Sequence, residues 1–192
     1  GGAVTNTPAE TIPSVTAREV YAANATPPQY ANAWYDMCPD GTVRPPSSGG
    51  PCTSSTKYAT LTSGNGQWRG FQYEGTPGGV ASWQLINGAA DGVYYFNNAN
   101  ETEGSGLGNP SSNAVTVIAS SVNTTTCARV GGTIDWNHDD IATPYIPNLF
   151  MFADNDLLTE SNGHAGGVSA GSVNAGMFIA GDQVSMQTSS QG

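Results

Sequence analysis

The sequence carries little charge, and most of that charge has one sign. Only 10% of the 192 residues are charged, and 15 acidic residues outnumber 5 lysines and arginines. The formal net charge of −10 repels phosphate backbones. The basic residues do not cluster along the chain; they are Arg18, Arg44, Lys57, Arg69 and Arg129. We therefore expect no nucleic-acid partner.

Long apolar runs are also missing. The longest run, 149–153, is far shorter than the ~20 residues that span a bilayer. The residues given contain neither a secretory signal nor a membrane helix. They predict no membrane contact of their own.

Residues that build surface helices are scarce, whereas turn formers are abundant. Surface helices use Glu, Lys and Arg on their wet face, but this chain is rich in Ser, Thr and Asn and has 25 glycines. The apolar and aromatic content argues against disorder. The length suits one domain with a substantial core. The composition thus predicts a folded, mainly β domain.

Two apolar runs near the end of the chain share one pattern. Each passes through apolar residues to an alanine, Ala153 or Ala180, and then through a polar corner with an acidic residue. Each reaches another apolar residue four positions after the alanine, at Leu157 and Val184. Nearly continuous apolarity predicts strands that are buried on both faces or packed in a parallel stack. We interpret the two runs as successive rungs of a stacked β-structure.

Two earlier segments fit the same stack. The runs that end at Asn97 and Ala119 can be aligned with those that end at Ala153 and Ala180. Unequal spacings between rungs are typical of a parallel β-helix, because loops of any length can leave its corners. We expect a parallel β-helix, or solenoid, with a right-handed coil. The alternative is a β-sandwich, whose turns recur about every 8 to 12 residues.

The chain divides into three predicted parts. Residues 1–15 form an extended N-terminal arm, 16–66 an N-terminal cap region, and 67–192 the β-helix stack. In the cap region, Thr16 and Glu19 have the spacing of a capping box, which predicts a short helix. We expect this helix to close one end of the stack.

Three cysteines are present. Cys38 and Cys52 frame a loop of Pro, Gly and Ser that could not hold itself together by burial. A disulfide between them would contribute roughly 3 kcal/mol by loop entropy. Two free thiols are the alternative, and the ligand spacing for zinc is missing. A disulfide indicates an oxidising, extracytoplasmic setting. Cys127 is left over, either buried or available to a partner chain.

The succession of rungs resembles a known family. Between residues 67 and 186 the chain carries QWRGF (67–71), WQL (83–85), DGVYYF (91–96), VTVIA (115–119), LFMFA (149–153) and GMFIAGDQV (176–184). This order resembles the β-helical ectodomains of type IV pilus-associated (PilX-like) bacterial surface proteins. The resemblance implies a structural protein of the cell surface, associated with a pilus or forming a filament. In that family a membrane-inserting, pilin-like helix precedes the stack.

An acidic cluster is the candidate for catalysis. Asp135, Asp139 and Asp140 flank His138 in the longest interval between rungs. Glycosidases with a β-helix fold hydrolyse polysaccharides with paired carboxyl groups, one as acid and one as base. Asp-rich loops are also common as solvated turns. We expect no enzymatic activity, with a polysaccharide hydrolase as the alternative.

A sugar-binding module is another form of that alternative. Its candidate stacking residues are Trp83, Tyr94 and Trp136. In either form of the alternative the partner would be a surface polysaccharide.

Asp154 and Asp156 begin a stretch that resembles a calcium loop, and Glu160 would supply a further oxygen ligand. The same residues would also serve as ordinary turn residues between two rungs. We expect no cofactor, with calcium as the alternative. Asn24, Asn100 and Asn123 each begin an N-glycosylation triplet, a pattern that a chain rich in Asn and Thr also produces by chance.

The ends of the stack are where we expect function. A terminal coil exposes unpaired backbone donors and acceptors, so it needs a cap or a neighbour. After the last rung, 183–192 carries no predicted helix and no charged gatekeeper. We therefore predict that the edge after Met186 joins another copy of the chain or a pilus subunit. The protein is interpreted as a non-enzymatic structural protein, extracellular or on the cell surface.

Overall fold

The fold is mainly β, with two sheets that face each other. The structure is a computed structural model, and it describes residues 15–25, 28–86, 88–102, 114–123, 130–136, 143–159 and 177–186. The helix α1 (Ala17–Asn24) and the single turn α2 (Pro28–Ala31) precede the strands, and a short 3-10 turn spans Pro77–Gly79. No helix in these ranges is long and apolar enough to cross a membrane.

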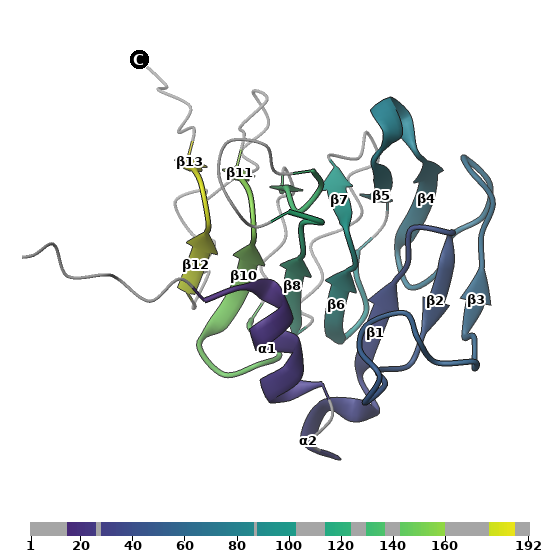
Figure 1. Cartoon of the computed structure of the whole chain (residues 1–192), viewed down its shortest axis with the longest axis horizontal. Coiled ribbons are helices and arrows are strands. Elements are labelled where there is room, and N and C mark those ends of the chain that lie inside the picture. The colour runs from purple at the N-terminus through teal and green to yellow at the C-terminus, as the bar shows by residue number, and fades with distance from the viewer. Residues whose placement is uncertain are drawn as a thin grey trace, which may run out of the picture.

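The larger sheet has seven strands and the smaller has six (Figure 1). The larger sheet has the order β12 (Met177–Ala180), β10 (Leu149–Ala153), β8 (Val115–Ala119), β6 (Gly92–Phe96), β1 (Trp34–Met37), β2 (Thr42–Arg44) and β3 (Ala59–Thr60). The smaller sheet has the order β13 (Val184–Met186), β11 (Leu157–Thr159), β9 (Ile134–Asp135), β7 (Ala99–Thr102), β5 (Ala81–Leu85) and β4 (Phe71–Gly75).

Most neighbouring strands are parallel. From β6 onward the chain alternates between the sheets, and each new strand pairs in parallel with the strand one coil earlier. This arrangement is consistent with a β-solenoid. Antiparallel pairs occur where β2 and β3 extend β1, and where β4 joins β5. Because β1 also pairs in parallel with β6, the larger sheet crosses the boundary predicted at residue 67.

The predicted alignment of rungs is confirmed for three of the four. Ala153 lies opposite Ala119 on one side and opposite Ala180 on the other. The alignment of Asn97 is wrong by one residue, because Phe96 lies opposite Ala119. Asn97 instead follows the strand and is succeeded by Asn98, which has a positive φ of 50°. Asparagine is one of the few residues other than glycine that adopt this left-handed conformation readily.

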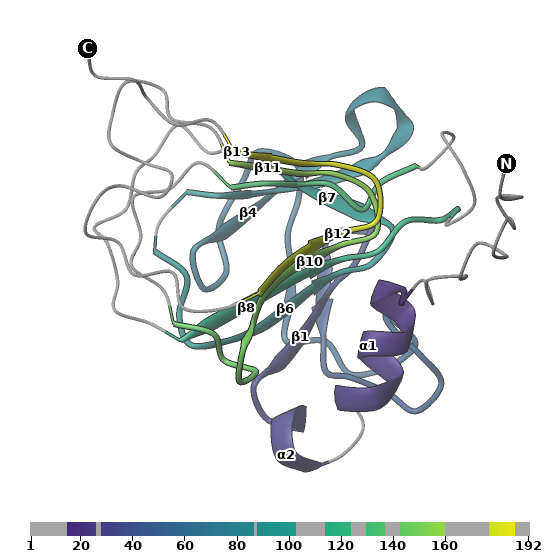
Figure 2. The same ribbon diagram turned by 90° about the vertical axis from the view of Figure 1, so that its left-hand side faces the viewer.

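The larger sheet is buried on both faces, which explains its uninterrupted apolar runs. Every residue of β6, β8 and β10 is buried. Tyr94 and Met151 belong to the core between the two sheets, whereas Tyr95 and Phe152 face the opposite way and pack with α1. The ring of Tyr21 in α1 meets the ring of Tyr95 at 4.9 Å between centroids. Figure 2 shows α1 on the side of this sheet that faces away from the other sheet.

The N-terminal helix forms as predicted but covers a different part of the stack. The capping box is present, with the Thr16 hydroxyl accepting from the Glu19 amide and the Glu19 carboxylate accepting from the Thr16 amide. The expectation that this helix closes an end of the stack is wrong. It packs across β1, β6, β8 and β10, because Tyr21 and two alanines give it an apolar side that fits the outer face of the sheet.

Candidate functional site

The open end of the stack is formed by β12 and β13. Among the described residues β12 pairs only with β10, and β13 pairs only with β11. Figure 2 shows the two strands at the front of their sheets. We call these two strands and the corner between them, residues 177–186, the terminal edge.

The backbone of the terminal edge directs hydrogen-bonding groups outward. Met177 and Gly181 donate their amide hydrogens to β10 and its flanks, at 2.7 Å from Asn148 O and 2.9 Å from Ala153 O. Alternation along a strand then places the amides of Phe178 and Ala180 on the outer side. A row of unpaired donors and acceptors of this kind is a template for another β-strand.

The side chains of the terminal edge are apolar and partly exposed. Met177 is 55% exposed and Val184 is 43% exposed. Asp182, at the corner, is the one charged residue in 177–186. Natural edge strands are usually protected by charges, proline or a covering loop. Within the described residues the terminal edge therefore lacks the protection that prevents pairing with other chains.

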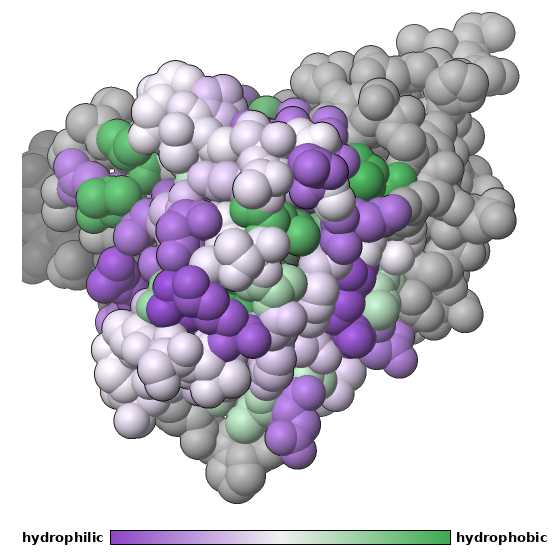
Figure 3. All heavy atoms as spheres, turned by 90° about the vertical axis from the view of Figure 1, so that its right-hand side faces the viewer, coloured by the Kyte–Doolittle hydropathy of each residue, from purple (hydrophilic) through white to green (hydrophobic). Residues whose placement is uncertain are grey.

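At the opposite end of the stack, which we call the closed end, the edge of the smaller sheet is covered. Gly64 donates its amide hydrogen to Tyr73 O, and the Ser63 hydroxyl donates to Glu74 O, both at 2.9 Å. Residues before β4 thus cover the outer edge of that strand, and β3 is only two residues long. Figure 3 shows this end with mostly pale and hydrophilic surface and only small hydrophobic patches. The two ends differ in both backbone pairing and surface character.

The residues predicted for catalysis are not brought together in the described part of the chain. Asp135 lies in β9, where its backbone is opposite Leu158 of β11. Asp139, Asp140 and His138 lie outside the described residues. The hydrolase stays an untested alternative.

The residues predicted to stack on sugars are buried. Trp83 and Tyr94 have no exposed surface, and Trp136 is 4% exposed. Trp83 packs on Tyr73 and Tyr94 on Phe71, with ring centroids 5.0 Å and 4.6 Å apart. The prediction of these three as a sugar platform is wrong, because their side chains point into the core between the sheets.

The calcium candidates lie at the corner between β10 and β11. Asp154 is buried, and both of its carboxylate oxygens accept backbone amide hydrogens, from Ala17 at 2.7 Å and from Ser121 at 3.0 Å. It therefore joins α1 to two coils of the stack. Asp156 is partly buried at the same corner, and Glu160 lies outside the described residues. No group of three potential metal ligands occurs among the residues that the structure describes.

The three candidate glycosylation sites differ in accessibility. The side-chain amide of Asn24 donates from Nδ2 to Val20 O within α1, and the Oδ1 atom of Asn100 accepts from the backbone amide of Thr133. Asn123 is exposed in the turn that follows β8. Of the three, Asn123 has the most accessible side chain.

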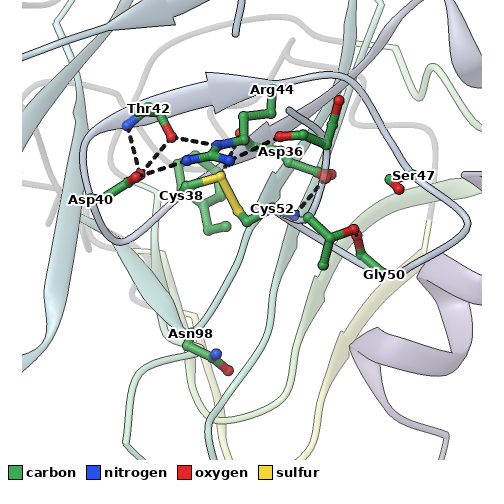
Figure 4. The surroundings of a disulfide bond; sticks show 12 residues. Asp36, Cys38, Asp40, Thr42, Arg44, Ser47, Gly50, Cys52 and Asn98 are labelled. Carbon is green, nitrogen blue, oxygen red and sulfur yellow. Dashed lines mark hydrogen bonds and ion pairs between the residues drawn. A yellow bond between two sulfur atoms is a disulfide. The ribbon is translucent and has the colours of Figure 1, made fainter. Parts of the chain in front are cut away.

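The predicted disulfide is present between Cys38 and Cys52, whose Cα atoms are 5.8 Å apart. It indicates an oxidising environment. Cys127 lies outside the described residues. Figure 4 shows the disulfide beside the carboxylate of Asp36, a residue that the sequence did not single out.

Asp36 is fully buried in β1 and connects three segments of the chain. Its carboxylate accepts hydrogen bonds from the Tyr21 hydroxyl at 3.1 Å, the Trp34 indole at 3.2 Å and the Cys52 amide at 2.9 Å. Burial raises the pKa of Asp36 to about 7, although these donors act in the opposite direction. A lone Asp among aromatic residues gives no sequence signal of this role.

The sequence predicts an open edge after Met186, and residues 187–192 lie outside the described residues. The exposure of Met177 and Val184 has no sequence signal. The exposed ring of Tyr58 also has no sequence signal, because nothing in the sequence distinguishes it from the rings of the core. Comparison of the chain with protein-family models, with curated protein sequences and with solved structures finds no match.

Proposed function

We propose that the protein is an extracytoplasmic structural protein that assembles by pairing its terminal edge with β-strands of another chain. The partner is a second copy of the chain or a pilus subunit. The observation that carries the proposal is the difference between the two ends of the stack. One end is closed by the residues before β4, and the other presents outward amides and exposed Met177 and Val184.

The physical chemistry of the terminal edge supports addition of a strand. New backbone hydrogen bonds would satisfy groups that water now solvates, and burial of two exposed apolar side chains would add a hydrophobic contribution. Burying apolar surface stabilises by about 25 cal/mol per Å². With one charged residue in 177–186, little electrostatic repulsion opposes close approach at this edge.

The cellular setting is part of the proposal. The Cys38–Cys52 disulfide supports a location outside the cytoplasm. The resemblance of 67–186 to pilus-associated β-helical ectodomains supports a place at the bacterial cell surface. The proposal assigns the protein no enzymatic reaction, and the right-handed sense of the coil stays a prediction.

The experiment compares association of the wild-type chain with that of Met177→Lys/Val184→Lys. Sedimentation velocity and negative-stain imaging over a range of concentrations would measure mass and shape. We expect the wild-type mass to rise with concentration and the double variant to remain monomeric, because two lysines at an edge oppose strand pairing. Both side chains are largely exposed, so the fold should tolerate the change.

Val122→Lys is the matched control. Val122 is an exposed apolar residue in the corner after β8, away from the terminal edge. The Val122→Lys variant should therefore associate like the wild type. Circular dichroism and thermal unfolding would verify that all variants are folded. A wild-type chain that stays monomeric at its highest soluble concentration would contradict the proposal, as would equal association of the wild type and the double variant.

A further inference from the structure

Two aromatic rings, one exposed and one partly buried, are stacked at the closed end of the stack, far from the terminal edge. Tyr58 directly precedes β3, and Trp68 lies in the turn before β4. Tyr58 is 46% exposed, and Trp68 is partly buried. Their ring planes are parallel to within 5°, and their centroids are 6.2 Å apart. We call the rings of Tyr58 and Trp68 the aromatic platform; Arg69 is its neighbour.

The two rings are held in place by a third. Tyr35 of β1 meets Trp68 edge to face at 4.9 Å and Tyr58 at 6.0 Å between centroids. Tyr35 is itself buried, so it fixes the platform to the core of the protein. A rigid aromatic surface loses little conformational entropy when a ligand binds to it.

The guanidinium group of Arg69 lies over two of these rings. Its Cζ atom lies 4.8 Å from the ring centroid of Tyr35 and 5.5 Å from that of Trp68. Nε donates to the Tyr94 hydroxyl at 3.2 Å, and Nη2 donates to Asp91 O at 2.6 Å. A guanidinium group has five N–H donors, so donors remain for the oxygens of a ligand.

The backbone at Arg69 has an unusual conformation. Its φ is 49°, in the left-handed region that few residues other than glycine adopt, and Gly70 follows with a φ of 96°. Such conformations cost of order 1–3 kcal/mol and are found more often at binding and catalytic sites. Here the conformation places the guanidinium group beside the platform.

We propose that the aromatic platform binds a neutral polysaccharide. The C–H face of a pyranose ring would stack on the exposed ring of Tyr58, next to the partly buried Trp68, and Arg69 would donate to hydroxyl or ring oxygens of the sugar. Two features disfavour an acidic polymer. The chain has a formal net charge of −10, which repels polyanions. The Asp91 carboxylate interacts electrostatically with Arg69 and so offsets part of its positive charge.

This site does not depend on the proposed assembly. The platform lies at the β3–β4 end of the sheets, whereas β12 and β13 form the other end (Figure 1). Assembly through the terminal edge would therefore leave the platform accessible. Monomeric protein is therefore sufficient for the test, and failure of either proposal would leave the other standing.

Tryptophan fluorescence gives a readout specific to the platform. The chain has four tryptophans, and Trp34, Trp83 and Trp136 are buried. Acrylamide quenching of native protein therefore reports mainly on Trp68. We expect a soluble β-glucan or α-mannan to shift the emission and to protect Trp68 from acrylamide, and we expect alginate, an acidic polymer, to have a weaker effect.

Paired substitutions at Tyr58 test the stacking contact. Tyr58→Ala should weaken binding by about tenfold or more, because truncating an aromatic contact residue commonly has effects of this size. Tyr58→Phe keeps the ring and should bind like the wild type, and Val122→Ala is the control at a distant site. Unfolding curves would verify that each variant is folded.

Three results would overturn the proposal. They are no response of folded protein to either neutral polymer, stronger binding of alginate than of the neutral polymers, and loss of binding in Tyr58→Phe equal to that in Tyr58→Ala. The last result would assign binding to the hydroxyl group and not to the ring face.

Discussion

At the scale of single residues, Asp36 is the group most sensitive to solution conditions. It is fully buried, and its hydrogen bonds join β1, α1 and the disulfide loop. In the folded protein its pKa is about 7, well above the ordinary value of 3.8. Between these values the folded state holds a proton that the unfolded state has released. The stability that the raised pKa of Asp36 contributes is therefore largest at low pH and is lost as the pH rises through about 7.

Asp36→Asn should flatten this dependence. As the pH rises from about 4 to about 7, the free energy of unfolding of the wild type should fall relative to that of the variant, by up to about 1.4 kcal/mol per pH unit. The measurement is urea unfolding at several pH values. The variant also changes hydrogen bonding, so the slope is the informative quantity and not the absolute stability.

Asp182→Asn removes an exposed carboxylate and serves as the control for Asp36. Measured in parallel, it gives the pH dependence of a chain that has lost an exposed carboxylate but keeps Asp36. If Asp36→Asn and the wild type had parallel stability profiles across this range, the account of Asp36 would be wrong.

Asp154 is predicted to stabilise through its two backbone hydrogen bonds. Asp154→Ala leaves the buried amide of Ala17 and the amide of Ser121 without this acceptor, and should lower the free energy of unfolding by about 3 kcal/mol. Asp156→Ala, at the same corner, should cost much less. Equilibrium denaturation measures the free energy of unfolding of both variants. An equal loss of stability in Asp154→Ala and Asp156→Ala would show that Asp154 acts only as a turn residue.

At the scale of elements, the disulfide loop between Cys38 and Cys52 contacts Asp36 through the Cys52 amide, which donates to the Asp36 carboxylate. Closing a loop of this length contributes about 3 kcal/mol in the chain-entropy model. Cys38→Ser/Cys52→Ser should therefore lower the free energy of unfolding by about that amount, as measured by chemical denaturation. A double variant as stable as the wild type would mean that the hydrogen bonds of the loop are sufficient without the covalent link.

The elements also show what the sequence could and could not predict. β8, β10 and β12 were predicted with their correct bounds, because each apolar run is bounded by polar residues and stacks on its neighbours. β6 was displaced by one residue, since a strand buried on both faces has no alternation to fix its ends. The antiparallel strands β2, β3 and β4 were not foreseen as extensions of the two sheets.

The candidate site was predicted only in outline. The sequence located the last rung but could not reveal which apolar side chains remain exposed, because this depends on packing between distant segments. For the same reason the sequence predicts Trp83, Tyr94 and Trp136 as sugar-stacking residues, although they are buried, and gives no signal for the exposed Tyr58. The position of α1 depends on Tyr21 and Asp154, which are far apart in sequence.

At the scale of the whole molecule, the two proposed functions lie at different ends of the stack. The closed end carries the aromatic platform, and the terminal edge is open to another β-strand. Because the two lie at opposite ends of the sheets, assembly and sugar binding can occur on the same chain (Figure 1).

Hydrogen exchange of the terminal edge at low and high protein concentration tests the proposal that this edge pairs with another chain. We predict that peptides containing Phe178, Ala180 and Val184 become protected as the protein associates, while peptides from β3 and β4 keep their exchange rates. Association that leaves the exchange of 177–186 unchanged, or that protects the β3–β4 end instead, would contradict it.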